Sequence, residues 1–566
     1  MSGARQFHSE ARRAARVPFL IALILIVAGA VLHLWYLLAN CPLDLSGDEA
    51  HYWEWSRHLD LSYYSKGPLV AYIIAAGRVA LADASMRLMG NETLAVRVPA
   101  ILLSVVTSLG IYTLTARAAR DWHPHVDRAG SASNSRYLAL GAVALTFSMP
   151  ILVVGSMLMT IDAPLSACWV WGIIAAYRAL RHDRIADWIG LGLLVAIGIL
   201  AKYTMLLLVP AVGLFILLDA AARRLLTRPG PYLAAVIGAC GMLPILIWNA
   251  QHDWVSFRHV AGQAGLGGAQ RHFDLGGIVE YVGGQLAVVG PAWIPLMLIA
   301  TLAAWREARK PRVDRKSDLR GFIAWAVLVP WTVFLLFSPV TKIQPNWPVI
   351  SVFPGTVLLV GWIAERWTRS RPLRTAVAIA SVFGLAAGIV LHRTDWLYPA
   401  FARLAANAPP WDLTPIAKYD PASRLRGWRQ LGAAVGNVLA REREAGREPF
   451  VVADDYQVAS QIAFYCPSSP PVYCIQVALG ERLSQYDVWE NPIRDRAHFV
   501  GRPCIYVGSR RAEIVGGDGH AAAMPALSEP ISVEHRVGGH LLAMWTIYVC
   551  QSFAGFEASG VGSLKY

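Results

Sequence analysis

The chain has 566 residues, of which 55% are hydrophobic and only 16% are charged. A soluble domain carries about 25% charged residues, so this composition and the long apolar runs exclude an ordinary soluble protein and indicate a membrane protein. The net charge is +13, but the basic residues gather in short loops between the apolar runs, as in cytoplasmic loops. No RNA- or DNA-binding motif accompanies them, so nucleic acid is not an expected partner.

The first predicted element is a transmembrane helix over residues 19–38, which is retained in the mature protein. Several arginines precede this run, and it ends in Trp35 and Tyr36. A secretory signal would have a shorter apolar core and a small-residue cleavage site, whereas this run is long enough to span a membrane.

Further apolar runs follow, and the stretch 188–218, broken only by Lys202, decides how many spans they form. The basic loops all fall on one side of the membrane only if the chain turns back at Lys202. The positive-inside rule then predicts about eleven spans, a cytoplasmic N-terminus and a C-terminus outside the cytoplasm. After the first helix, these spans are predicted at 98–116, 137–155, 162–178, 187–201, 203–218, 232–248, 286–305, 320–338, 349–364 and 375–391.

The predicted fold is therefore an α-helical polytopic membrane domain, residues 1–391, followed by a soluble α/β domain, residues 392–566, outside the cytoplasm. The second part mixes short β-rich runs with a helical stretch over 428–443. Two outer loops are large, 39–96 and 249–285. The first contains an amphipathic stretch, which we expect to lie in the membrane interface because a span there would break the charge alternation.

Five of the seven cysteines fall in segments predicted outside the cytoplasm, where an oxidising compartment permits disulfides. Cys466 with Cys474 and Cys504 with Cys550 are candidate pairs, although the sequence alone does not fix the pairing. The absence of a CxxC spacing argues against a thiol metal site.

Asp48 and Glu49 are adjacent carboxylates just after the first helix. Ser46 and Glu49 fit a capping box, which would give Glu49 a structural role. Asp48 is left without such a role, and a carboxylate at the membrane face can act as general base on an alcohol or amine. The aromatic residues Tyr52 and Trp53 can stack on a sugar ring, although Trp and Tyr are also ordinary residues of the membrane interface.

Asp162 lies between two apolar spans, where it would serve structurally as the N-cap of the next helix, with Pro164 in the first turn. An acid at a membrane boundary is costly enough to suggest function as well. Lys66, Lys202 and Lys342 each end an apolar run on the predicted outer side. Snorkelling to the interface explains each lysine singly, whereas together they could hold an anionic lipid phosphate and stabilise it as a leaving group.

The outer loop 249–285 adds more polar residues, but its histidines lack metal-ligand spacing and give a weak metal signal. These residues are His252, Arg258, His259, Arg271 and His272.

Five motifs in order, DEAHYWEW, SYYSKGP, TIDAP, LAKYT and KIQPNWP, resemble the family-39-type glycosyltransferases of the C superfamily. This family includes protein O-mannosyltransferases and the aminoarabinose transferases that modify lipid A. The resemblance covers residues 19–391. It implies the GT-C fold and transfer of a sugar from a polyprenyl phosphate to an acceptor at the outer face of the bacterial inner membrane, by a single inverting displacement.

The resemblance also implies roles for the individual residues. Asp48 would be the base or acceptor-orienting carboxylate, with Glu49 as its neighbour and Asp162 as the second acid. Lys66 and Lys202 would bind the donor phosphate. The resemblance supports this role less strongly for Lys342, because its loop varies among relatives. Tyr52, Trp53 and Tyr64 are the predicted substrate-binding aromatics. No resident cofactor is implied, metal dependence stays open, and lipid A, another glycan or a protein would fit as acceptor.

Two other classes of function remain alternatives. A transporter or lipid flippase would show repeated halves and helices broken at the bilayer midplane, whereas here the candidate charges lie at span ends and no two halves match. A non-catalytic scaffold, whose soluble domain binds a partner, is the third reading.

Overall fold

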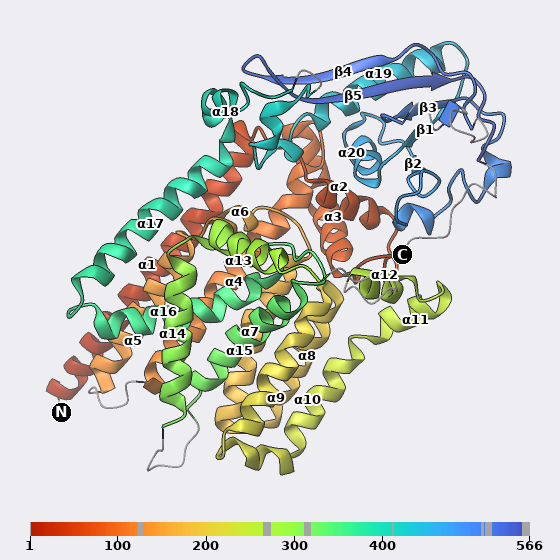
Figure 1. Cartoon of the computed structure of the whole chain (residues 1–566). Helices are drawn as coiled ribbons and strands as arrows, with labels where there is room; N and C mark the ends of the chain where they lie inside the picture. Colours follow the sequence, from red (N-terminus) through yellow and green to blue (C-terminus); the bar gives the residue numbers. More distant parts are fainter. Residues whose placement is uncertain are drawn as a thin grey trace.

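A computed structural model describes residues 2–122, 128–263, 273–310, 318–409, 412–510, 514–515 and 523–556. It confirms the predicted fold class, because a bundle of apolar helices is followed by a small α/β unit with one sheet (Figure 1). The sheet lies at one end of the bundle, here called the sheet end, and the N-terminus lies at the opposite end, here called the N-terminal end (Figure 1).

The bundle begins with α1 and ends with α17, and short 3-10 helices interrupt it where the chain turns. Its helices are α1 (Ser2–Asn40), α2 (Gly47–Arg57), α3 (Leu69–Met89), α4 (Thr93–Trp122), α5 (Arg128–Thr146), α6 (Pro150–Gly155), α7 (Asp162–His182), α8 (Ile185–Ala201), η1 (Tyr203–Leu207), α9 (Leu208–Leu218), η2 (Ala222–Thr227), α10 (Pro229–Cys240), α11 (Leu243–Gln251), α12 (Val255–Gln263), α13 (Gly276–Val289), α14 (Trp293–Ala308), α15 (Arg320–Phe337), η3 (Trp347–Ser351), α16 (Val352–Arg366) and α17 (Arg371–His392).

Within the described residues, eight helical segments are long and apolar enough to cross a membrane, and α13 with α14, bent by 102° at their junction, would make a ninth. The shorter apolar segments α8 and η1–α9 fall where two more spans are predicted. The total of about eleven spans stays a prediction.

The turn predicted at Lys202 is present. Helix α8 ends there, and Lys202 has extended backbone angles, φ −158° and ψ 133°. The chain then returns through α9 and η2, so that Gly230 at the start of α10 lies against Trp188 at the start of α8. A Cβ at position 230 would approach that indole ring to 2.1 Å, so only glycine permits this contact.

Helix α3 stays at the sheet end, although its length and composition would also suit a span. Gly67, just before α3, lies so close to the end of α8 that a Cβ there would be 2.3 Å from the carbonyl oxygen of Leu200. Arg78, in the middle of α3, pairs at 2.6 Å with Glu92, just before α4. Both the start and the middle of α3 therefore contact the same end of the bundle, as expected of an outer-loop helix.

The C-terminal sheet has the order β2-β1-β3-β5-β4, with β1 parallel to β2 and β3, and β5 antiparallel to β3 and β4. β1 and β3 are buried along their whole length, as is usual for parallel strands covered on both faces. The predicted β-rich runs and the helix over 428–443 are found. The elements are η4 (Thr394–Leu397), α18 (Tyr398–Leu404), η5 (Pro415–Lys418), η6 (Ser423–Leu425), α19 (Trp428–Glu444), β1 (Phe450–Ala453), α20 (Tyr456–Tyr465), β2 (Val472–Cys474), η7 (Gln485–Asp487), η8 (Arg496–His498), β3 (Cys504–Val507), β4 (Ile531–Val537) and β5 (His540–Cys550).

All seven cysteines are free thiols in this structure. Cys504 and Cys550 nevertheless occupy facing positions on β3 and β5, so this predicted pair is adjacent in space.

The segment 39–96 and the C-terminal unit share one hydrophobic core. Trp53 and Trp55 from α2 belong to the same buried cluster as Leu431 from α19 and Ile462 from α20. Helix α2 also packs directly against α20 and α3. The position of α2 is therefore set jointly by the bundle and by the sheet unit.

A fully buried ion pair fixes α2 to the bundle. The Glu49 carboxylate accepts hydrogen bonds from Arg97 Nε at 3.0 Å and Nη2 at 2.9 Å, and neither side chain is exposed. It also accepts the backbone N–H groups of Ser46 at 2.9 Å and Met159 at 3.0 Å, and the predicted capping box is present. These contacts join α2 to α4 and to the segment before α7.

We predict that Arg97→Met destabilises the protein by about 3–5 kcal/mol, because it leaves the Glu49 carboxylate buried without its counter-ion. Denaturant titration of the purified protein measures this loss. Arg78→Met is the matched control, since Arg78 pairs with Glu92 while both remain partly exposed, and the expected loss is about 1 kcal/mol or less. Equal losses in the two variants would contradict a special role for the buried pair.

Candidate active site

Asp48 and Glu49 have opposite environments although they are neighbours on α2. Glu49 is completely buried, whereas Asp48 is accessible to solvent and surrounded by the charged side chains of Lys66, Arg482 and Asp162. Gln457 of α20 hydrogen-bonds the Asp48 side chain. The same Gln457 covers Gly47, where a Cβ would lie 2.7 Å from its side chain. The glycine before Asp48 thus allows α20 to approach the carboxylate.

Asp162 and Lys202 meet where α7 begins and α8 ends. Lys202 Nζ lies 2.7 Å from Asp162 Oδ1, and Lys202 is buried. Asn346 Nδ2 donates to the other carboxylate oxygen at 2.6 Å. The N-cap of α7 is Ile161, with no side-chain capping bond, so the capping role considered for Asp162 is not the one observed. Its carboxylate instead holds two distant segments together.

The two predicted acids and two of the predicted lysines lie within electrostatic reach of one another. Burial raises the pKa of Asp48, while the charges of Lys66 and Arg482 oppose this and that of Asp162 adds to it. Burial and the nearby Lys202 charge lower the pKa of Lys66 to about 8, against the effects of Asp48 and Asp162. One site therefore contains Asp48, Asp162, Lys66 and Lys202.

Arg482, which the sequence analysis missed, extends the site into the C-terminal unit. Its charge contributes to the pKa of Asp48 and Lys66, and it lowers that of His259. Its guanidinium carbon lies 5.6 Å from the ring centroid of Tyr456, and Nη2 donates to the Tyr456 hydroxyl at 3.4 Å. No sequence spacing relates residue 482 to residue 48, so only the fold reveals this neighbour.

Two pockets adjoin this site. The first, of about 210 Å³, has Lys66 and Lys202 on its wall and is otherwise largely apolar, with Phe334, Phe337 and Trp347 among its lining residues. We call it the lysine groove. The second, of about 480 Å³, is polar and lies where β1, β2 and β3 end, lined by Asp454, Asp455, Tyr456, Gln457, Gln476, Glu481, Arg482, Ser509 and Arg510. We call it the sheet-edge pocket.

Asp48 interacts with residues of both pockets, with Gln457 of the sheet-edge pocket and with Lys66 of the lysine groove. Open α/β sheets commonly bind ligands at the carboxyl ends of their parallel strands. A third, mainly apolar cavity of about 600 Å³ inside the bundle reaches Asp162 and Asn346. The site can therefore hold an anion beside an apolar chain, and a polar group next to a carboxylate.

The other predicted site residues are placed differently. Lys342 pairs with Glu280 at 2.9 Å, both largely exposed, and does not join the cluster. Trp53 donates its indole N–H to Glu92 at 2.8 Å and packs on Phe464, which is a structural position. Glu49 is also structural, because its hydrogen bonds hold α2 in position.

Tyr52 and Tyr64 lie closer to the charged cluster. Burial and the charges of Asp48 and Asp162 raise the pKa of the Tyr52 hydroxyl well above its ordinary value. The ring of Tyr64 packs on His259, with centroids 4.7 Å apart.

The described residues contain no group of three or more His, Cys, Asp or Glu side chains arranged to hold a metal ion. His252 stacks on Trp248, with ring centroids 4.0 Å apart. Arg271 and His272 lie outside the described residues.

Residues 131–248 match the family model described as dolichyl-phosphate-mannose-protein mannosyltransferase. The lipid A galacturonosyltransferase RgtD of Rhizobium johnstonii is 28% identical over 377 residues, which cover 65% of this chain and 72% of the relative.

Among solved structures, ArnT from Cupriavidus metallidurans bound to undecaprenyl phosphate superposes with a TM-score of 0.57 at 17% identity, over 94% of this chain and 99% of the other. Its apo form gives 0.54 at 16% identity, with the same coverage. These likenesses establish the fold.

The chain is thus similar to this mannosyltransferase family over residues 131–248 and to the lipid A galacturonosyltransferase over 65% of its length. The matched segment 131–248 contains Asp162 and Lys202. Asp48, Lys66 and Arg482 come from segments outside that match, and the fold brings them to the same place.

We predict that Gly47→Ala lowers glycosyl transfer about 10²-fold, because the added Cβ displaces Gln457 and shifts Asp48 from its position. The protein should still fold. Gly190→Ala, where a Cβ meets no atom within 4 Å, is the matched control and should keep full activity in the same radiolabel transfer assay. Unchanged activity in Gly47→Ala would show that this close approach does not position Asp48.

Proposed function

We propose that the chain transfers a hexosyl or pentosyl group from a polyprenyl-phosphate donor to a hydroxyl or amine of an envelope glycan, with lipid A as the leading acceptor class. The observation that carries the proposal is the position of Asp48, between an apolar groove bearing two lysines and a polar pocket at the edge of a sheet. The names of the relatives, a lipid A galacturonosyltransferase and a protein bound to undecaprenyl phosphate, support it.

The lysine groove suits the donor. Lys66 and Lys202 supply positive charge for the phosphate, and Phe334, Phe337 and Trp347 supply apolar surface for the first isoprene units. Fixed cations stabilise a phosphate most strongly when it gains charge as a leaving group. Asp162 holds Lys202 in place through their ion pair of 2.7 Å.

The sheet-edge pocket suits the acceptor. In an inverting displacement the nucleophile attacks the anomeric carbon on the face opposite the leaving phosphate, so the acceptor has to approach from the side away from Lys66 and Lys202. Gln457, Tyr456 and Arg482 offer polar groups for a saccharide there, and Arg482 suits a phosphate or carboxylate substituent. The C-terminal unit would thus select the acceptor.

Asp48 would act as the general base. Its carboxylate accepts the proton of the acceptor O–H or N–H while that atom forms a bond to the anomeric carbon. The bond between the anomeric carbon and the phosphate oxygen breaks at the same time, and its electron pair leaves with the phosphate beside Lys66. The raised pKa of Asp48 brings this base closer to neutral pH, where a general base is most effective.

We further propose a multi-pass position in the bacterial inner membrane, with the N-terminal end in the cytoplasm and the sheet end in the periplasm. The basic connections before α10 and before α17 supply the cationic loops that the positive-inside rule assigns to the cytoplasm. The donor groove and acceptor pocket would then open at the outer face.

We predict that Asp48→Asn lowers kcat about 10²–10⁴-fold, the contribution of a general base, with little loss of donor binding. The assay uses purified protein, a polyprenyl-phosphate sugar and a lipid A acceptor. Lys342→Met is the control lysine variant and should remain active, whereas Lys66→Met should not. Full activity of Asp48→Asn, or donor translocation without transfer as in a flippase, would contradict the proposal.

A second prediction concerns pH. Lys66 must be protonated to hold the phosphate, and its pKa of about 8 means that kcat/KM is maintained below that pH and falls as the pH rises through it. Because kcat/KM reports groups of the free enzyme, its pH profile is the measurement. Lys66→Arg should move the alkaline limb to higher pH, since a guanidinium stays charged. An unmoved limb would assign it to another group.

A further inference from the structure

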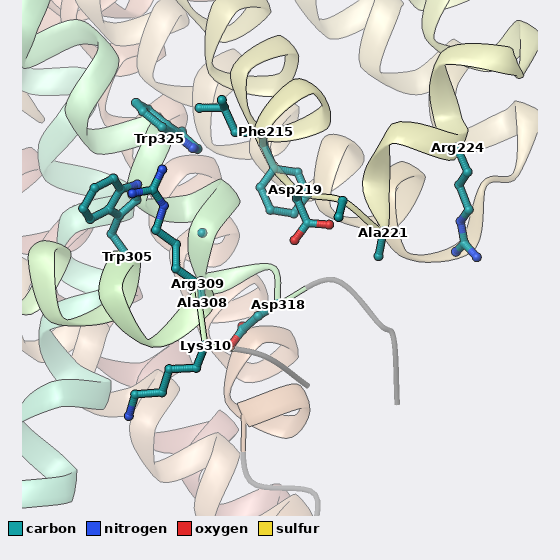
Figure 2. A pocket seen from close by; sticks show the side chains of 13 residues that line it. Phe215, Asp219, Ala221, Arg224, Trp305, Ala308, Arg309, Lys310, Asp318 and Trp325 are labelled. Atoms are coloured by element: carbon teal, nitrogen blue, oxygen red, sulfur yellow. The ribbon is translucent and has the colours of Figure 1, made fainter. Parts of the chain in front are cut away.

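A large pocket lies at the N-terminal end of the bundle and plays no part in the proposed reaction. It occupies about 920 Å³ where α9, α14 and α15 come together beside η2, as Figure 2 shows. Its lining combines aromatic and aliphatic side chains with cations and two acids: Phe215, Leu218, Asp219, Ala220, Ala221, Arg224, Trp305, Ala308, Arg309, Lys310, Asp318, Gly321 and Trp325.

The apolar wall of this pocket is closely packed. Trp305 of α14 and Trp325 of α15 meet edge to face, with ring centroids 6.4 Å apart. Gly321 allows α15 to approach its neighbours, since a Cβ there would lie 3.2 Å from Ala308 and 3.3 Å from Phe215. The aromatic surface is therefore held in place by helix packing.

The two acids are engaged by the protein itself. Asp219 accepts the backbone N–H of Ala222 at 2.8 Å. Asp318 is buried and accepts both the backbone N–H of Arg320 at 3.0 Å and its side chain at 2.9 Å and 2.7 Å. Their carboxylates are thus directed to local donors.

The two arginines of the lining, Arg309 and Arg224, differ from these acids. Arg309 extends along Trp305, with its guanidinium carbon 4.1 Å from the ring centroid (Figure 2). Neither Arg309 nor Arg224 forms an ion pair with any residue that the structure describes. Lys310 pairs with Glu307, and both remain exposed. The pocket therefore presents positive charge beside an aromatic wall.

We infer that this pocket binds an anionic membrane phospholipid, with the phosphate of its headgroup on Arg309 and the start of its acyl chains against Trp305 and Trp325, whereas Arg224 lies on the opposite side of the pocket (Figure 2). Guanidinium groups match phosphate geometry, Trp is favoured at the membrane–water boundary, and basic pockets between helix ends bind anionic headgroups. A soluble phosphate ester offers the same head chemistry but has nothing to occupy the aromatic wall.

The full-length protein in phosphatidylcholine nanodiscs, titrated with phosphatidylglycerol, tests this inference. Native mass spectrometry counts the anionic lipids retained. The Arg309→Ala variant should weaken phosphatidylglycerol binding about tenfold, since a hydrogen bond to a charged group contributes about 1.5–3 kcal/mol. Arg366→Ala is the matched control, because Arg366 stacks on Trp362 at 4.7 Å in a similar way but does not line the pocket, and its binding should be unchanged.

Three results would overturn the inference. Unchanged phosphatidylglycerol binding in Arg309→Ala would show that the pocket is not the site. An equal loss in Arg366→Ala would reduce the effect to general surface charge. Competition by glycerol phosphate at the concentration of the lipid would assign the pocket to a soluble phosphate ester. A Trp305→Ala variant distinguishes the lipid from the soluble ester, because it should weaken lipid binding but not glycerol phosphate binding. Unchanged thermal unfolding in phosphatidylcholine shows that the variants are folded.

Discussion

The ion pair between Glu49 and Arg97 is the contact on which the rest of the active site depends. Both side chains are fully buried, and pairs of this kind contribute less to net stability than to a fixed geometry, because desolvation offsets much of their attraction. The Glu49 carboxylate accepts hydrogen bonds from Arg97, Ser46 and Met159. Its neighbour on the same helical turn, Asp48, is thereby left to interact with Lys66 and Gln457, which line the two pockets.

The site is composite, and this explains why the helical bundle carries an α/β unit packed on one end (Figure 1). The bundle supplies Asp162 and Lys202 from helix ends, the segment 39–96 supplies Asp48 and Lys66, and the C-terminal unit supplies Gln457 and Arg482. The shared hydrophobic core of α2, α19 and α20 holds these parts in register. A donor with an apolar tail and an acceptor with a polar head can then meet at one carboxylate, each from its own side.

Much of the site could be predicted from the sequence, because its charged residues stand at unusual positions along the chain. Lys202 interrupts an apolar stretch, Asp162 stands at a span end, and Asp48 lacks a capping role, so each was identifiable alone. Arg97 and Arg482 were not, because Arg97 lies within an apolar helix near its start and Arg482 in a loop among many exposed arginines. Lys342 satisfied the same charge rule yet pairs with Glu280, because the rule locates a residue along the membrane normal but not around the bundle.

A structure of the protein with a polyprenyl-phosphate sugar bound tests the central claim most directly. The account predicts that the phosphate lies within hydrogen-bonding distance of Lys66 and Lys202, with the isoprene chain along Phe334 and Trp347, and that the Asp48 carboxylate faces the anomeric carbon from the sheet-edge side. A phosphate bound away from both lysines, or an anomeric carbon turned away from Asp48, would contradict it.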